Sequence, residues 1–395
     1  MNDPLLAWRD RFPILEHSTY LVNHSLGAMP AAVFDALREY AEMWATRGIR
    51  AWSEGWWTSP VTTGNLVGKI IDAPEGSVVM HQNVSVIQGL IASALEFKPE
   101  RNRVVYTAMN FPSVMYAWEA QRRRGAEIVA VPSPDGIGVP TEDLLAAIDE
   151  RTLIVPISHV LFQTGFQQDL AAVVARARQV GALVIADCYQ ATGTVPISVT
   201  ELGIDMLCGG SVKWLCGGPG AGYLYVRPDL RDTLQPALTG WMAHAEPFAF
   251  EPGEQRYADD ATRLLHGSPA VPALYAARSG YEIIAEIGVD AIRKKSVHQT
   301  TMFMQAAAER GYSSKSPTDP ARRGGTVTVM VDHAPAVVAA LAEREILIDC
   351  RPDVGLRISP HFYTSDDELL GCLDAVDEIL STGAWERHAK DAAAY

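Results

Sequence analysis

The feature that most constrains the fold is an alternation of short apolar runs with amphipathic stretches between residues 75 and 230. Five of the runs read SVVMHQ, RVVYTA, EIVAVP, LIVPIS and ALVIAD, and stretches such as DLAAVVARARQVG separate them. Apolar runs of this length are typical of strands buried on both faces, and the stretches between them have helical periodicity. The sequence therefore predicts an α/β domain with a mainly parallel sheet.

The same pattern divides the chain into three parts. Residues 1–50 contain a Gly/Pro turn and an amphipathic helix, and we expect them to pack on a small domain or on a partner subunit. Residues 51–255 form the predicted large α/β domain. Residues 256–395 give a long helix, from about Pro269 to Glu286, and then a strand-helix-strand-helix tail. The pattern of residues 256–395 predicts a linking helix and a small C-terminal α+β domain.

Composition narrows the class of protein. The chain has 395 residues, of which 48% are hydrophobic, so it can bury a large core in more than one structural unit. Its 33 basic and 47 acidic residues give a net charge of -14, which lacks the positive field that nucleic-acid binding requires. No stretch reaches the ~20 uncharged apolar residues needed to span a bilayer. We expect a soluble cytoplasmic protein without nucleic-acid or membrane partners.

The five cysteines form no CxxC pair and leave one residue over. Neither a disulfide framework nor a zinc site fits this spacing, so we expect reduced thiols and no metal.

Two residues at predicted strand ends point to chemistry. Asp187 ends the run ALVIAD, and Lys213 lies in GGSVKWLCGGPGAG, between the apolar segment IDMLC and the strand YLYV. Ligands of open α/β sheets bind at the carboxyl ends of the strands. A lysine in a dry site has a lowered pKa and can attack an aldehyde, and a carboxylate can keep a pyridine nitrogen protonated. Each residue alone also fits a solvated loop lysine or a capping aspartate, so their combination carries the prediction.

Further candidates lie at the starts of two predicted helices. Val84 and Ser85 separate the run SVVMHQ from a helix beginning near Val86, where backbone N–H groups can hold a phosphate. An ordinary helix cap fits that position equally well. Phe111, just before Pro112, can stack on a flat ring, although a lone aromatic residue is more often part of a core.

Eight segments together resemble a known family. They are LVNHSLGAMP, IRAWSEGWW, NFPSVMY, SHVLFQTGF, ADCYQATGTVP, GGSVKWLCGGPG, GWMAHAEPFAFEP and LRISPHFYTS. Their order and spacing resemble those of the kynureninases, which belong to the class V aminotransferase superfamily of fold-type I pyridoxal-phosphate (PLP) enzymes. The resemblance runs from about residue 10 to residue 385. It implies the α/β fold of those PLP-dependent transferases, with a seven-stranded-type sheet and a small α+β C-terminal domain.

The resemblance also implies roles for individual residues. Lys213 would be the catalytic residue that binds pyridoxal 5'-phosphate as an imine, and Asp187 would pair with the pyridine nitrogen. The other cofactor-binding residues would be Phe111, Val84, Ser85, Gln190, His159, Trp241 and Ser268. Trp241 and Ser268 would come from the neighbouring subunit of a homodimer with shared active sites. An amino-acid substrate would be bound by Arg357, His24, Ser25, Trp52, Trp56 and His244.

Some of these residues have simpler interpretations. Arg357 would hold the substrate α-carboxylate in a bidentate pair, but it also fits a surface strand. Trp56 fits a core position as well as an aryl-binding pocket.

Four positions depart from the kynureninase pattern. Val212 stands where kynureninases carry a tyrosine, a candidate proton donor and phosphate ligand, and Val114 stands where they carry an aspartate. Gln190 replaces a histidine, as in other class V enzymes, and His24 replaces an asparagine. The resemblance implies hydrolytic Cβ–Cγ cleavage of a kynurenine-type aryl-ketone amino acid to an aromatic acid and alanine. The departures leave open a class V aminotransferase or a β-eliminating lyase acting on a specialised amino acid.

Two further hypotheses fit less well. A cysteine desulfurase is disfavoured because Cys350, seven residues before Arg357, offers no long mobile loop. A Rossmann-type binding protein is disfavoured because GGPGAG precedes a strand and does not open a helix.

Overall fold

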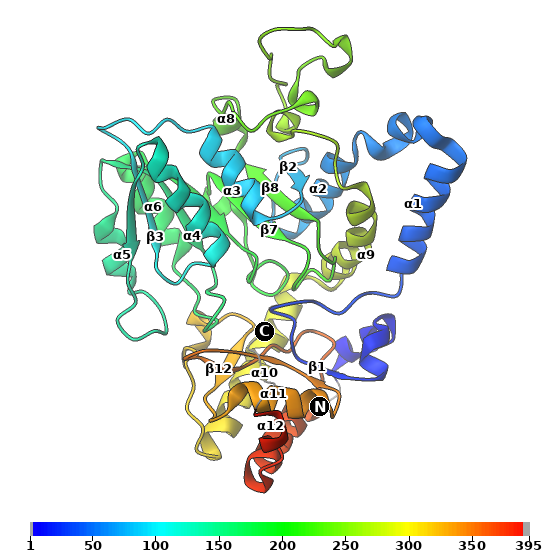
Figure 1. The fold of residues 1–395 in the computed structure, drawn as a ribbon, viewed down its shortest axis with the longest axis vertical. Coiled ribbons are helices and arrows are strands. Elements are labelled where there is room, and N and C mark those ends of the chain that lie inside the picture. The colour runs from blue at the N-terminus through cyan, green and yellow to red at the C-terminus, as the bar shows by residue number, and fades with distance from the viewer. Residues whose placement is uncertain (1–2, 390–395) are drawn as a thin grey trace.

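The large part of the molecule is built on one seven-stranded sheet (Figure 1). The computed structural model describes residues 3–389. In spatial order the strands are β2 (Val78–His81), β8 (Gly222–Val226), β7 (Met206–Gly210), β6 (Leu183–Asp187), β5 (Thr152–Ser158), β3 (Arg103–Thr107) and β4 (Glu127–Val131). The five strands from β7 to β4 are parallel neighbours, whereas β8 is antiparallel to both β7 and β2. The predicted mainly parallel sheet is confirmed.

The reversal at β8 has a local cause. Residues 211–221 connect β7 to β8 without a regular helix, so the chain turns directly back beside the strand it has just left. A parallel connection would need a crossover segment, usually a helix.

The strands send alternate side chains to two hydrophobic clusters, one on each face of the sheet. Along β6, Val184 and Ala186 join one cluster and Ile185 joins the other. Burial on both faces explains why the strand sequences are continuously apolar. The first face is covered by α2 (Ser59–Ile70), α5 (Thr141–Ala147), α6 (Leu170–Val180), α7 (Val199–Leu202) and α9 (Val271–Ile287). The second face is covered by α3 (Val84–Ser93) and α4 (Pro112–Glu119), and α8 (Pro228–Arg231) follows β8.

The small part is an antiparallel sheet covered by helices, at the other end of the long axis (Figure 1). Its strands, in spatial order, are β11 (Asp349–Arg351), β12 (Gly355–Ile358) and β9 (Val327–Val329). Its helices are α10 (Val289–Glu309), α11 (Ala334–Ala342) and α12 (Asp366–Thr382). Helix α9 contacts α2 in the large part, and α10 contacts α12 in the small part. The domain limits predicted from the sequence remain a prediction.

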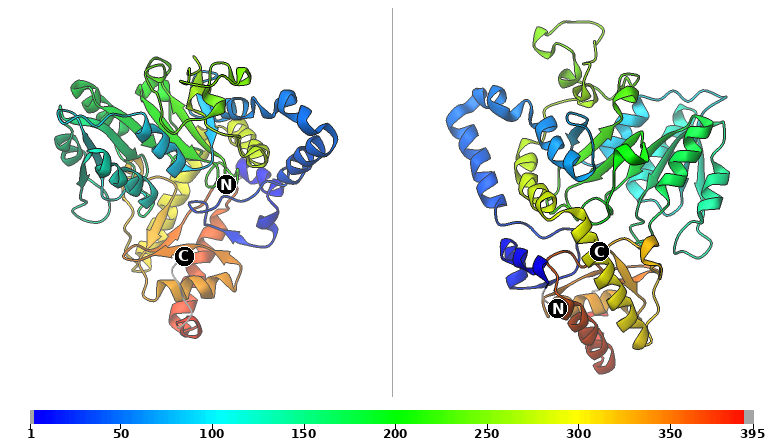
Figure 2. Two further views of the ribbon diagram at one scale, coloured as in Figure 1. Left: turned by 45° about the horizontal axis from the view of Figure 1, so that its top comes forward. Right: turned by 180° about the vertical axis from the view of Figure 1, so that it is seen from behind.

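The N-terminal segment runs along the small part before it crosses to the large one (Figure 2). Strand β1 (Thr19–Tyr20) pairs in parallel with β10 (Ile346–Leu347), and the Arg9 guanidinium donates to the Glu368 carboxylate at 2.8 Å. Helix α1 (Val33–Arg47) then packs against α9. None of the helices within residues 3–389 has the length and apolar surface that crossing a membrane requires.

A glycine in α9 allows this helix to approach the loop that carries Lys213. A Cβ atom at Gly280 would lie 2.2 Å from the Leu215 carbonyl oxygen and 2.9 Å from that of Cys216. We therefore expect Gly280→Ala to destabilise the protein by about 1–3 kcal/mol through overpacking.

Gly371, on the exposed side of α12, is the matched control, because a Cβ atom there would meet nothing within 4 Å. Gly371→Ala should stabilise the protein by about 0.5–1 kcal/mol through helix propensity. Denaturant unfolding of the two variants measures both effects, and equal free energies of unfolding would contradict the close contact at α9.

Candidate active site

A buried carboxylate marks the carboxyl edge of the large sheet. Asp187 ends β6, next to Ser158 at the end of β5, and its side chain accepts from the Tyr189 N–H at 3.1 Å and the Ser158 hydroxyl at 3.4 Å. Burial raises the pKa of Asp187, against the opposing effects of these hydrogen bonds and of Lys213. Asp187 forms no ion pair with any residue in the described range 3–389. A buried carboxylate without a protein cation fits a ligand that brings a positive charge, such as a pyridinium.

Lys213 lies three residues beyond β7 at the same edge. Its Nζ atom is 5.4 Å from the centre of the Phe111 ring and 5.6 Å from that of Tyr189. Burial lowers the pKa of Lys213 to about 8, although the Asp187 charge acts in the opposite direction. A sizeable fraction of the amine is therefore unprotonated near neutral pH and able to attack an aldehyde.

The start of α3 faces the same edge, because β2 runs antiparallel to β8 and therefore parallel to β7. The Asn83 side chain caps this helix by accepting from the Val86 N–H at 3.1 Å. The helix begins at Val84, two residues earlier than the sequence predicts, so Val84 and Ser85 both lie in its first turn. Backbone N–H groups in a first turn have no partner within the helix and can bind a phosphate.

Gln190 joins the N-terminal segment to the loop of Lys213. Its amide nitrogen donates to the His24 carbonyl at 2.9 Å, and its amide oxygen accepts from the Trp214 indole at 3.0 Å. The second amide hydrogen remains available for a cofactor oxygen. His159, after β5, is buried, and burial lowers its pKa to about 4. Among residues 3–389 its Nδ1 atom has no hydrogen-bond partner, which fits a ligand contact.

Arg357 is held by a carboxylate of its own chain. Residues Asp349 and Arg357 pair across the β11–β12 hairpin, and the Nε atom of Arg357 donates to Asp349 at 2.7 Å while Nη2 contacts the other oxygen. Arg357 Nη1 donates to the Phe162 carbonyl at 2.6 Å. Arg357 is 2% exposed, so it does not lie on a surface strand. A guanidinium has five N–H donors, so two of those on Nη1 and Nη2 remain for a second carboxylate.

His24 belongs to the same network. Its ring nitrogens lie 2.8 Å from the Asp349 carboxylate and 2.6 Å from the Ser359 hydroxyl. Burial, followed by the charge of Arg357, lowers the pKa of His24 to about 4, so the ring is neutral near pH 7. Despite the burial of Asp349, its hydrogen bonds to His24 and Arg357 hold its pKa below the usual value. A neutral His24 with its proton on Nε2 donates to Asp349 and positions the carboxylate that orients Arg357.

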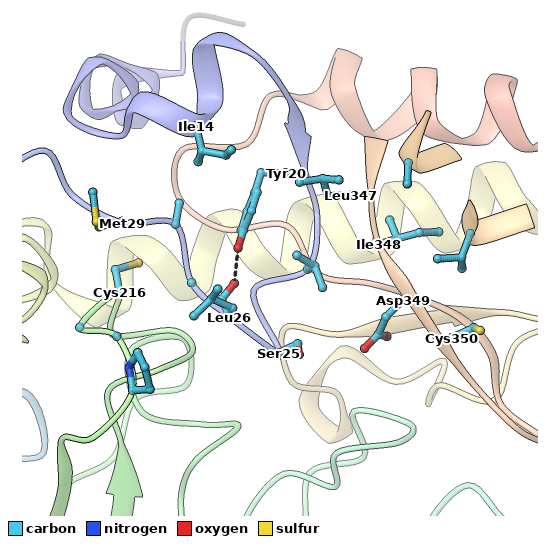
Figure 3. Close-up of a pocket in the computed structure, with 18 of the residues that line it drawn as sticks. Ile14, Tyr20, Ser25, Leu26, Met29, Cys216, Leu347, Ile348, Asp349 and Cys350 are labelled. Atoms are coloured by element: carbon cyan, nitrogen blue, oxygen red, sulfur yellow. Dashed lines mark hydrogen bonds between the residues drawn. The ribbon is translucent and has the colours of Figure 1, made fainter. Parts of the chain in front are cut away.

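The N-terminal segment approaches the Lys213 loop through a glycine. The Gly27 N–H donates to the Val212 carbonyl at 2.8 Å, and a Cβ atom at Gly27 would lie 2.0 Å from the Lys213 carbonyl oxygen. On the side of the small part a cavity of about 1020 Å³ opens beside this segment (Figure 3). Ser25 and Asp349 line this cavity, and the Tyr20 hydroxyl donates to the Leu26 carbonyl at its edge.

Five other candidate residues contact their own surroundings instead of Lys213. Trp56 stacks on Tyr40 and meets Trp52 edge to face, in a cluster between α1 and α9. Trp241 packs against Trp57 and against Phe248 of its own loop, and the His244 ring accepts from the Glu246 N–H. Ser268 lies between η8 (Ala261–Leu264) and α9. The predicted roles of Trp52, Trp56, Trp241, His244 and Ser268 stay predictions.

Three residues of the site were missed from the sequence as chemistry-bearing positions. Asp349 pairs with Arg357, and Tyr189 lies beside Lys213. Gly27, part of the predicted Gly/Pro turn, lies against the Lys213 backbone. The segment DCRPDVGLR contains a turn signal between short strands, which would place Asp349 opposite Arg357. Within residues 3–389 no group of three or more His, Cys, Asp or Glu side chains is arranged to hold a metal ion.

Comparison with known proteins gives the family. The profile described as "Aminotransferase class-V" matches residues 19–359. A protein named "Kynureninase" from Pseudomonas fluorescens is 31% identical over 97% of this chain and 94% of its own length. A second relative, the "Uncharacterized aminotransferase YcbU" of Bacillus subtilis (strain 168), is 30% identical over 95% of this chain and 97% of its own.

Solved structures agree in fold. The apo cysteine desulfurase of Thermococcus onnurineus NA1 matches with a TM-score of 0.86 at 21% identity, over 97% of this chain and 99% of its own. The cystine C-S lyase C-DES matches with a TM-score of 0.83 at 18% identity, over 93% and 99% of the two chains. These matches confirm the fold-type I architecture. The chain belongs to the aminotransferase class-V family and is a pyridoxal-phosphate-dependent enzyme.

Proposed function

We propose that the protein hydrolyses the Cβ–Cγ bond of a kynurenine-type aryl-ketone amino acid and releases an aromatic acid and alanine. The supporting observation is the meeting of Lys213, Asp187 and Arg357 in a chain that is similar along almost its whole length to proteins named kynureninase. Asp187 and Arg357 are both close enough to Lys213 to influence its pKa.

The residues at the sheet edge match the chemical groups of pyridoxal phosphate. When bound, the cofactor supplies an aldehyde for the substrate amine and a protonated ring that accepts electrons from the substrate α-carbon. Asp187 would hold the ring nitrogen, and Phe111 would stack on the ring. The start of α3, with Val84 and Ser85, would hold the phosphate. The remaining contacts would come from Gln190 and His159.

Residues of the same site can also bind the substrate and transfer its α-proton. The two free N–H donors of Arg357 would bind the substrate α-carboxylate, while Asp349 fixes the guanidinium plane. Lys213 in its neutral form would take the α-proton and return a proton to the product. The reaction balances with one water, because its OH joins the γ-carbonyl carbon and its H joins the β-carbon when the Cβ–Cγ bond breaks.

The alternative is transamination or β-elimination on a specialised amino acid. One observation supports this alternative: a relative that is 30% identical to this chain is named an aminotransferase. A persulfide-forming reaction at Cys350 has no support from its position, since Cys350 lies inside β11 and is 4% exposed.

We also propose that the enzyme works as a homodimer. Helix α1 and the short helix η3 (Gly48–Ala51) after it carry exposed apolar side chains, with Phe34 at 61%, Trp44 at 62% and Ile49 at 82% exposure. A second exposed group surrounds Trp241, which is 42% exposed. Exposed apolar surfaces of this kind are typical of subunit interfaces.

The first prediction of this proposal concerns the substrate. Protein mixed with L-kynurenine or 3-hydroxykynurenine should release a fluorescent aromatic acid together with alanine. Lys213→Ala should lose this activity by several orders of magnitude, because it removes both the cofactor anchor and the base. Release of keto acid in the presence of an acceptor, without aromatic acid, would instead support the aminotransferase.

The second prediction concerns pH. Only the unprotonated Lys213 amine attacks an aldehyde, and burial lowers its pKa to about 8. In the cofactor-free protein the rate of cofactor capture should therefore rise as the pH approaches about 8 and level off above it. Stopped-flow absorbance measures this rate, with Lys213→Ala as the blank. A rate that keeps rising towards the ordinary lysine pKa would contradict a desolvated amine.

The third prediction concerns shared sites. Lys213→Ala and Trp241→Ala chains should each be nearly inactive, but their mixture should regain activity after dissociation and reassociation. In a homodimer with Trp241 acting across the interface, each mixed dimer has one intact site, which gives about a quarter of the wild-type activity. A mixture without recovery would place Trp241 in the site of its own chain or outside the site.

A further inference from the structure

The tyrosine that kynureninases carry just before the imine lysine is a valine in this chain, Val212, so the proposed phosphate end lacks that hydroxyl. Val212 offers no hydroxyl, and the start of α3 then has Ser85 as its one side-chain donor in the first turn of that helix. Another hydroxyl, that of Tyr189, lies against the backbone of Gly210 at the end of β7. This residue lies two positions beyond Asp187, and sequence reasoning assigned it no role.

The Tyr189 ring lies beside the reactive amine. Its centre is 5.6 Å from Lys213 Nζ, nearly the same as the 5.4 Å between this atom and the Phe111 ring. The ring is partly buried against the hydrophobic cluster on the α3 side of the sheet. Tyr189 is therefore fixed by packing on the same face as the helix that would bind the phosphate.

Two glycines, Gly210 and Gly222, allow the Tyr189 side chain to lie close to the start of that helix. A Cβ atom at Gly210 would lie 2.1 Å from Tyr189 Cε1 and 2.5 Å from its hydroxyl oxygen, so the ring rests directly on the backbone of β7. Gly210 pairs with Gly222 on β8, and a Cβ atom at Gly222 would lie 3.1 Å from the backbone nitrogen of Asn83. Tyr189, the two glycines and the cap of α3 thus form one continuous contact.

This series of contacts ends at the first turn of α3. The Val84 N–H lies close enough to the Tyr189 oxygen to oppose the rise in the pKa of this phenol, so the hydroxyl lies near the first turn of α3, where the helix has unpaired donors. Burial raises the pKa of Tyr189, which keeps the phenol protonated. A protonated phenol can donate to a phosphate that the N–H groups of the same helix start also hold.

We propose that the Tyr189 hydroxyl binds the phosphate of the cofactor at the start of α3 and replaces the hydroxyl that Val212 lacks. The inference rests on the cofactor position given under the proposed function, but not on which reaction follows. It explains how the phosphate end of the site keeps a tyrosine although the chain has lost the one next to Lys213.

Tyr223 provides the matched control. It lies on Gly209 much as Tyr189 lies on Gly210, since a Cβ atom at Gly209 would be 2.0 Å from the Tyr223 hydroxyl oxygen. Tyr223, however, belongs to the hydrophobic cluster on the other face of the sheet, away from α3. Loss of its hydroxyl removes the same group from a buried tyrosine without touching the phosphate end.

The experiment compares two ligands in the cofactor-free full chain. Pyridoxal phosphate and pyridoxal, which lacks the phosphate, are titrated by absorbance into wild type, Tyr189→Phe and Tyr223→Phe. Tyr189→Phe should weaken pyridoxal phosphate binding tenfold or more, as expected for a lost hydrogen bond to a charged group, and leave pyridoxal binding unchanged. Tyr223→Phe should bind both ligands as wild type does.

Two results would overturn the inference. Unchanged affinity of Tyr189→Phe for pyridoxal phosphate would show that the hydroxyl does not bind it. An equal loss for both ligands would assign Tyr189 to the ring and not to the phosphate. A wild-type protein that binds neither ligand would instead overturn the cofactor site on which the inference rests.

A second variant tests the replacement itself. Adding Val212→Tyr to Tyr189→Phe restores a tyrosine at the position used by the family, and it should recover most of the lost affinity for pyridoxal phosphate. Matching circular dichroism spectra and melting temperatures establish that the variants are folded. A folded double variant that binds as weakly as Tyr189→Phe would contradict the replacement.

Discussion

The carboxylate of Asp187 is the constraint on which the site depends. It is buried at the end of a central strand, and the described residues give it two hydrogen bonds but no cation. A buried charge without a partner costs about 3–5 kcal/mol, so the folded protein carries an electrostatic deficit at this point. In the proposed site, a pyridinium bound at Asp187 would offset this deficit and so link the stability of the fold to the presence of the cofactor.

A second buried ion pair connects the two parts of the molecule. Arg357 and Asp349 lie on the hairpin of the small part, but Arg357 also donates to the carbonyl of Phe162 in the large part. His24, from the N-terminal segment, holds the same carboxylate. Three segments far apart in sequence therefore meet at one guanidinium. If Arg357 binds the substrate carboxylate as proposed, substrate binding and the packing of the small part against the large one would be coupled.

The sheet and its two charged residues could be predicted because the signals are local. A continuous apolar run identifies a strand buried on both faces, and the strand-end rule then places Asp187 and Lys213 at one edge. The start of α3 was predicted two residues late because the cap is set by a single side-chain hydrogen bond, from the Val86 N–H to Asn83.

The partners of the charged residues could not be predicted in the same way. The contact of Tyr189 with Lys213 and that of Gln190 with Trp214 depend on the packing of three strands and a loop. The packing of Trp56 on Tyr40 follows from the course of α1 over α9, which no local pattern indicates.

The departure from the family pattern at Val212 is easier to understand together with the residues around it. Val212 offers no hydroxyl beside Lys213, while Tyr189 carries one at the same edge, and Gly210 provides the space that the Tyr189 ring requires. A side chain at residue 210 would occupy the position of the Tyr189 ring, so a tyrosine at residue 189 depends on a glycine in β7. Residues 189, 210 and 212 therefore all lie at the proposed phosphate end, and among them Val212 is the departure from the family pattern. The groups proposed to act on the substrate, Lys213 and Arg357, are not among these three residues. A changed phosphate contact is thus compatible with an unchanged reaction at the substrate, and the absence of a tyrosine at residue 212 is not by itself evidence against hydrolysis.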